Sequence, residues 1–536
     1  MSARGLELLG VMTMRHRLRL SAGIYKSRVA LSGVALAAMM LSQPAFADAK
    51  ADCLSNDDER VVRGCTILIK KNPKNDDALL SRAWAYRGLK KYDLAIADWT
   101  SIIALDNRSE NWKQRAQVRV LKGDAKGAIS DLTTAIGMPD GANNSSLFRI
   151  RAKAYYREEK FDLAVADFTR VIELGPNYVD GYVNRGGAFE KKGSLELAIA
   201  DFTKGIALAK APSEKATAYI WRGGAYAEKG DHARAVEDLS AAFTLKEPDA
   251  LEIEDRAREY EALGQWDLAI NDYARAIELD RAEPDTVFLR GRAYARKGDF
   301  APALQDLDAA ISMDPDETEY RLARAQVLLA MDRTEAAIED LDATIELDGK
   351  RAAAYLLRAR ALHLRHQYQK ALGDFDRAIE LATDAERSPA YFERGIVRAA
   401  LRDLAGAIAD FDAAIRLDPR NATYYTMRGA LHGVQGNPDK AIADYGQSIS
   451  LAPGDSWRYT VRAWALLKAG KAQQGLQDIN RALAMEPRLA SALATRGHIH
   501  EALGNRGSAI ADFKTALEVA PGMADARQAL VRLSGR

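Results

Sequence analysis

Only two cysteines occur among the 536 residues, which excludes both a cysteine-rich metal site and a disulfide-dense small domain. Neither charge sign dominates, because 76 Lys and Arg stand against 75 Asp and Glu, so the basic excess of a nucleic-acid binder is missing. Long apolar runs are scarce as well. The run Val29–Leu41 would extend only about 20 Å as a helix, too short for a hydrocarbon core of about 30 Å.

The first 47 residues differ from the rest of the chain. Basic residues precede the run Val29–Leu41, and the following "QPAFA" places Ala45 and Ala47 at the small-x-small spacing that a signal peptidase needs. We therefore predict a cleaved secretory signal, rather than a membrane anchor, with no stable membrane insertion afterwards and a periplasmic or secreted location. Cleavage removes six Lys or Arg and one Glu, which leaves 70 basic against 74 acidic residues, so no nucleic-acid partner is expected.

Cys53 and Cys65 both follow the predicted signal. In an exported protein an even pair of cysteines favours a disulfide, and closing a loop of about 12 residues would contribute roughly 3 kcal/mol. A metal site with further ligands and a pair of buried free thiols are the alternatives.

One sequence motif recurs through the chain at a period of about 34 residues. The dipeptide Arg-Ala or Arg-Gly marks each occurrence, and an Asp follows each of these arginines sixteen residues later. The arginines are Arg82, Arg115, Arg151, Arg185, Arg222, Arg256, Arg290, Arg324, Arg358, Arg394, Arg428, Arg462 and Arg496, and the aspartates are Asp98, Asp131, Asp167, Asp201, Asp238, Asp272, Asp306, Asp340, Asp374, Asp410, Asp444, Asp478 and Asp512. We predict a charge-assisted pair in each unit, within or between units, and favour a structural role over a ligand-binding one because all units share it.

Each unit contains two helical patterns. Residues 284–297 carry one apolar stripe at helical spacing, Gly298 and Asp299 interrupt it as a turn would, and residues 303–311 carry a second stripe. The residue directly after each marker Arg is never larger than Ala, which allows helices to approach to about 8 Å. Each unit is thus predicted to be a hairpin of two antiparallel helices that buries its faces only against its neighbours.

The pattern of small and aromatic residues is specific. Ala152 and Tyr155 on a first helix, with Ala164 and Phe168 on the second, resemble the tetratricopeptide-repeat family, and the resemblance recurs in one register over about residues 53 to 521. It implies an all-α, right-handed superhelical solenoid of antiparallel helix hairpins whose concave face holds a peptide or a partner protein. Arg119, Arg398, His432 and His500 stand where the first-helix aromatic usually is.

The period divides the chain into four parts. We predict a signal peptide at 1–47, a partial repeat or cap at 48–75, an array of thirteen helix hairpins at 76–522, and a C-terminal capping helix at 523–536. Caps at both ends are expected because the outer hairpins of an open array lack a neighbour.

No constellation of catalytic residues is apparent. In "HLRH" the two histidines, His363 and His366, have no acidic residue beside them that would complete a metal triad, and no glycine-rich phosphate loop follows a predicted strand. We therefore expect no enzymatic activity, no metal and no cofactor.

Function is then expected on the outward side of the first helices, which the resemblance places on the concave face. The residues there that we predict to contact a partner are Lys113, Arg149, Lys153, Tyr156, Arg258, Arg292, Trp457 and Trp464. Tryptophans at helical spacing are also compatible with the core. The family's carboxylate clamp, a set of Lys, Asn, Asn, Lys and Arg, is not reproduced. We predict a non-enzymatic interaction scaffold in the bacterial periplasm, with a factor for envelope polysaccharide export that contacts glycan through groove aromatics as the alternative.

Overall fold

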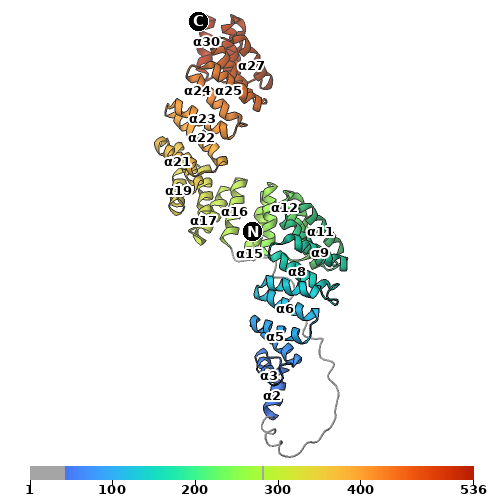
Figure 1. Ribbon diagram of the computed structural model, residues 1–536. Coiled ribbons are helices and arrows are strands. Elements are labelled where there is room, and N and C mark those ends of the chain that lie inside the picture. Colours follow the sequence, from blue (N-terminus) through green and yellow to red (C-terminus); the bar gives the residue numbers. More distant parts are fainter. Residues whose placement is uncertain (1–42, 280–282, 536) are drawn as a thin grey trace, which may run out of the picture. The chain divides into compact units, whose positions relative to one another are not determined.

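The computed structural model describes residues 43–279 and 283–535, so most of the predicted signal peptide lies outside the described part. Every regular element in these ranges is an α-helix, and within each of two units neighbouring helices pack side by side (Figure 1). The chain divides into two compact units, Met1–Ala225 and Tyr226–Arg536. Each unit is a stack of antiparallel helix hairpins, which confirms the predicted all-α solenoid.

The helices have nearly uniform lengths. Those that begin in the first unit are α2 (Gln43–Cys53), α3 (Asp58–Lys71), α4 (Asp76–Gly88), α5 (Tyr92–Leu105), α6 (Ser109–Lys122), α7 (Ala125–Ile136), α8 (Ser145–Arg157), α9 (Phe161–Leu174), α10 (Val179–Lys191), α11 (Leu195–Leu208) and α12 (Pro212–Glu228). Those of the second unit are α13 (His232–Leu245), α14 (Ala250–Ala262), α15 (Trp266–Leu279), α16 (Pro284–Lys297), α17 (Phe300–Met313), α18 (Thr318–Ala330), α19 (Thr334–Leu347), α20 (Ala352–Leu364), α21 (Tyr368–Leu381), α22 (Asp384–Ala400), α23 (Leu404–Leu417), α24 (Ala422–Val434), α25 (Pro438–Leu451), α26 (Ser456–Lys468), α27 (Ala472–Met485), α28 (Ala490–Ala502), α29 (Arg506–Val519) and α30 (Ala524–Ser534).

The turn inside each hairpin requires left-handed backbone. Glycine supplies it in most repeats, as Gly298 does with φ of 94°. In five repeats a residue with a side chain takes the same conformation, at Lys90, Glu159, Asp332, His366 and Arg402. A non-glycine residue costs about 1–2 kcal/mol in this region, so these turns are held by the packing of their two helices.

Small residues hold the two helices of a hairpin close together. A Cβ added at Gly186 would come within 2.6 Å of the Phe202 ring, and one added at Gly497 within 2.7 Å of the Phe513 ring. Phe202 and Phe513 are completely buried on second helices. In these hairpins the small residue after the marker Arg therefore makes room for the second-helix aromatic ring, and enlarging it would overpack the hairpin.

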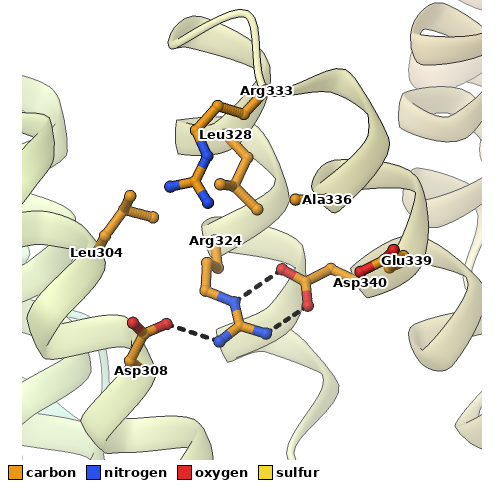
Figure 2. A pocket seen from close by; sticks show the side chains of 8 residues that line it. All are labelled: Leu304, Asp308, Arg324, Leu328, Arg333, Ala336, Glu339 and Asp340. Atoms are coloured by element: carbon orange, nitrogen blue, oxygen red, sulfur yellow. Dashed lines mark hydrogen bonds and ion pairs between the residues drawn. The ribbon is translucent and has the colours of Figure 1, made fainter.

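The marker arginines form the predicted ion pairs inside single hairpins. Arg324 on α18 donates from Nε to Asp340 Oδ2 at 2.8 Å and from Nη2 to Asp340 Oδ1 at 2.5 Å, as Figure 2 shows. The same two-bond pair joins Arg82, Arg115, Arg151, Arg185, Arg256, Arg290, Arg358, Arg394, Arg428, Arg462 and Arg496 to the Asp sixteen residues later. The pair of Arg222 and Asp238 would cross the division between the units and stays a prediction.

The third guanidinium nitrogen reaches the preceding repeat. Arg324 Nη1 donates to Asp308 on α17 at 2.6 Å (Figure 2), and Arg115 Nη1 donates to Thr100 on α5 at 2.9 Å. From Arg115 onward the acceptor lies two residues after the preceding marker Asp, and for Arg82, which no marker Asp precedes, it is Thr66 on α3. It is a Thr for Arg82, Arg115, Arg151, Arg185 and Arg222, a Ser for Arg256, an Asp for Arg324, Arg358, Arg394 and Arg428, and an Asn for Arg496. Each marker Arg in this list therefore joins two repeats.

Both ends of the described chain are closed by extra helices. A disulfide between Cys53 and Cys65 joins α2 to α3, as predicted. Helix α2 begins at Gln43 and so includes the predicted cleavage point after Ala47, and cleavage there stays a prediction. At the other end α30 packs on α29, and His498 on α28 bonds Asp525 of α30 at 2.7 Å.

Candidate functional site

In the first unit, two of the predicted contact residues share a cavity. Arg149 and Lys153 on α8 line a space of about 120 Å³, together with Arg157 at the end of the same helix. Val120 of α6, with Ile150 and Ala154, forms its apolar wall. Arg157 was missed by the sequence reasoning, although its spacing of four residues from Lys153 places it on the same face of the helix.

The electrostatics of this cavity are unbalanced. Burial lowers the pKa of the half-buried Lys153 amine, and repulsion from Arg149 and Arg157 lowers it further, against a smaller opposing effect of Asp180. Asp180 itself accepts the Tyr178 hydroxyl at 3.0 Å. Positive charge therefore gathers at this cavity and is only partly balanced, by the attraction of Asp180 on Lys153 and by the interaction of Arg149 with Tyr178.

The two other candidates in the first unit make structural contacts. Lys113 donates to Glu110 one turn earlier on α6, at 2.5 Å. Tyr156 packs edge-on against Phe161 with ring centroids 5.4 Å apart, and burial raises the pKa of its hydroxyl. Neither residue lines the cavity that Arg149 and Lys153 share.

The cationic candidates in the second unit are also neutralised. Arg258 pairs with Glu254 and Asp255 on its own helix, α14. Arg292 on α16 reaches back to Glu261 on α14 at 2.9 Å. These two arginines thus carry contacts within and between first helices, and they offer less free charge than the sequence suggested.

The two candidate tryptophans lie at the surface of α26. Trp457 is 46% exposed and Trp464 is 37% exposed, so neither is a core residue. The Lys468 amine lies over the Trp464 ring at 4.5 Å, and the His498 ring meets the same indole edge-on at 5.6 Å. The two indoles are therefore exposed aromatic surfaces on one helix, and that of Trp464 lies between a cation and a histidine.

A larger cavity of about 280 Å³ lies between α17, α18 and α19 (Figure 2). Among its lining residues, Leu328 stands at the place that Tyr294 holds in the preceding repeat, and Ala336 at the place that Leu268 holds two repeats earlier. The Arg324 guanidinium on its floor is already held by Asp308 and Asp340. Three of the charged groups that line the cavity are therefore paired with one another.

In the ranges 43–279 and 283–535, no helix has the length and apolar character needed to cross a membrane. The same residues contain no group of three or more His, Cys, Asp or Glu side chains that could hold a metal ion.

Two sequence models of one family, both described as "Tetratricopeptide repeat", match the chain. One matches residues 151–212, 254–318, 322–386 and 392–456, and the other matches residues 216–249 and 490–522. Together these segments make up more than half of the chain. No curated protein matches the sequence.

Several solved structures are similar to the chain. The APC/C hetero-tetramer Cut9-Hcn1 contains a chain that is 14% identical over 92% of this chain and 98% of its own, with a TM-score of 0.37. YrrB, a TPR protein with an unusual peptide-binding site, is 22% identical over 36% of this chain and 98% of its own, with a TM-score of 0.32. A tetratricopeptide repeat protein from Parabacteroides merdae is 20% identical over 47% of this chain and 99% of its own, with a TM-score of 0.37.

Proposed function

Because the chain belongs to the tetratricopeptide-repeat family, we propose that it is a non-enzymatic scaffold that binds a protein or peptide partner through the exposed faces of its first helices. The first helices are the members of each hairpin that carry the marker Arg, such as α8 and α26. The small residues and the buried rings pack the helices of each hairpin against each other. The exposed side chains of the first helices take no part in this packing and remain available to a partner.

The exposure of Trp457 and Trp464 carries this proposal. Each indole keeps more than a third of its surface in water, although burying it inside the repeat would stabilise the fold. Tryptophan is among the residues that contribute most to binding energy at protein interfaces. Two of them on one face of α26 form a ready anchor for apolar side chains of a partner.

We also propose that the mature protein is exported to the periplasm. The basic and apolar pattern of residues 1–47 and the disulfide of Cys53 and Cys65 support this, because disulfides persist in oxidising compartments. Fractionation of the native host followed by N-terminal sequencing tests it. A mature N-terminus at Asp48 in the periplasm supports export, and an intact chain in the cytoplasm contradicts it.

Site-specific photo-crosslinking in the native host tests the binding function. A photoreactive amino acid is placed at Trp457 or Trp464, and in a control at Leu268, which is similarly exposed on the second helix α15. We expect a discrete crosslinked protein, identified by mass spectrometry, from the two α26 positions only. Equal products at all three positions, or none at any, would count against the first-helix surface.

A glycan partner is the second candidate, because exposed indole faces also stack on sugar rings. In the same experiment a polysaccharide attached at position 457 or 464, with no protein partner, would favour a role in envelope polysaccharide export. Hydrolase or transferase activity of the pure protein would contradict the non-enzymatic assignment.

A further inference from the structure

His498 on α28 contacts both the exposed Trp464 indole and the C-terminal capping helix α30. Its ring meets the indole edge-on with the centroids 5.6 Å apart, and it meets the buried Phe513 ring edge-on at 4.8 Å. Its Nε2 lies 2.7 Å from Asp525 Oδ2 on α30. Because an ionised carboxylate only accepts hydrogen bonds, Nε2 carries the proton of this bond. The two rings and the carboxylate together fix the orientation of the His498 side chain, which is 14% exposed.

Helix α30 depends on few contacts for its position. It has 11 residues, of which only Ala526 and Ala529 are buried, and it packs on α29. An isolated helix of this length is marginal in water, so the docking of α30 is an equilibrium that a single contact can shift. Its polar contacts with earlier helices join Asp525 to His498, Arg532 to Glu501 at 2.8 Å, and the Leu533 carbonyl to Arg506 at 2.8 Å.

The two exposed indoles of α26 differ in their relation to α30. Trp464 touches His498, and the Lys468 amine lies over its ring at 4.5 Å. Trp457 lies about two turns earlier on the same helix, and among the described residues no ring or cation contacts its indole. Of the two tryptophans, Trp464 is therefore the one whose side chain is linked to the capping helix.

We propose that His498 is a positioning residue that couples the binding of a partner at Trp464 to the docking of α30. A partner that covers the indole in its present orientation also secures the imidazole ring beside it, and this ring holds Asp525 on α30. The coupling is reciprocal, so a docked α30 raises the affinity for the partner by the same factor by which the partner favours docking. The coupling rests on the proposed binding function and adds its regulation, because α30 then responds to occupation of the α26 surface.

Hydrogen exchange of the purified full chain, measured by mass spectrometry at short labelling times, tests the link without a partner. Trp464→Ala should speed exchange in α30 by about threefold or more, because the His498 ring loses one of the neighbours that orient it. Trp457→Ala removes a similarly exposed indole from the same helix and should leave α30 unchanged. Exchange in α18 and α19 should stay unchanged in both variants. An unchanged α30 in Trp464→Ala, or equal effects of the two substitutions, would overturn the coupling.

Two substitutions of His498 separate its two contacts. His498→Phe keeps a ring beside Trp464 but cannot donate to Asp525, so exchange in α30 should rise by about threefold or more. His498→Gln keeps an N–H donor for Asp525 and lacks the ring, so α30 should remain protected, and Trp464→Ala added to it should have no further effect. If Trp464→Ala speeds exchange equally in the native and the His498→Gln backgrounds, His498 does not carry the coupling.

Photo-crosslinking from position 457 in the native host measures the reverse direction. Asp525→Ala releases α30 from His498 and should lower the yield of crosslinked partner by about threefold or more. Gln528→Ala, which removes another exposed side chain of α30, should leave the yield unchanged. A crosslinked partner whose yield ignores Asp525→Ala leaves the scaffold function standing and removes the coupling. A native chain with no crosslinked partner contradicts the proposed function, and hydrogen exchange then decides by itself whether Trp464 holds α30.

Discussion

The two aspartates that hold Arg324 should differ greatly in their contribution to stability. Asp340 belongs to the same hairpin and accepts two hydrogen bonds, whereas Asp308 belongs to the preceding repeat and accepts one (Figure 2). The Asp340 side chain is 8% exposed and that of Asp308 is 60% exposed. Asp340→Asn and Asp308→Asn each remove one negative charge beside the same guanidinium, so the two substitutions can be compared directly.

The expected magnitudes follow from burial. Removing one partner of a buried ion pair costs about 3–5 kcal/mol, and because Arg324 keeps Asp308 as a partner we expect about 3 kcal/mol for Asp340→Asn. An exposed ion pair contributes about 0–1 kcal/mol, which we expect for Asp308→Asn, and high salt should abolish that contribution. The first value corresponds to at least a hundredfold change in a local opening equilibrium and the second to less than about fivefold.

Hydrogen exchange of α18 and α19, followed by mass spectrometry, measures these effects locally. A local measurement is needed because a stack of repeats opens in parts, so that a single unfolding midpoint would average over many hairpins. Asp340→Asn should speed exchange in α18 and α19 but leave α28 and α29 unchanged. If the two substitutions have equal effects, or if Asp308→Asn has the larger effect, the pair of Arg324 and Asp340 within the hairpin is not the stronger of the two ion pairs, and the reasoning is refuted.

Three further outcomes are expected. Glu159→Gly relieves left-handed backbone at φ of 57° and should stabilise the first unit by about 0.5–1 kcal/mol in urea unfolding, and a lower midpoint would contradict this strain. Ala274 stands before Arg290 at the place where Asp308 stands before Arg324. Ala274→Asp should therefore give Arg290 an acceptor in the preceding repeat. It should slow hydrogen exchange in α15 and α16 in low salt but not in 1 M salt, and equal slowing in both would show that charge is not the cause. Burial lowers the pKa of His432, so the unfolded chain takes up the proton first as pH falls below about 6.5, and stability is lost. His432→Tyr should reduce the loss of thermal stability between pH 7 and pH 5, and an unchanged pH profile would exclude His432 as its source.

The sequence was sufficient for features that every repeat needs. The Arg and Asp columns, the small residue beside each Arg, and the pairing of Cys53 with Cys65 all appeared as predicted. The Arg, Asp and small-residue positions were predictable because helical spacing fixes which residues share a face of a helix. They also recur at the same place in every repeat, which distinguishes them from chance similarity.

The candidate contact residues were harder to predict. Arg258 and Arg292 lie on first helices, but Glu254 and Glu261 neutralise them. Arg157, which was not predicted, lines the same cavity as Arg149. Periodicity gives the face of a helix but not the reach of each long side chain, and that reach decides which charges meet.

The sequence by itself determined the repeat, its two helices and the residues that lock them together, because those depend on spacing along one chain. Only the tertiary structure decided that the Arg324 guanidinium divides its hydrogen bonds between Asp340 of its own hairpin and Asp308 of the hairpin before. It also decided that Trp457 stays exposed while Phe513 is buried. These outcomes depend on how adjacent helices are placed against each other, which sets the neighbours of every side chain.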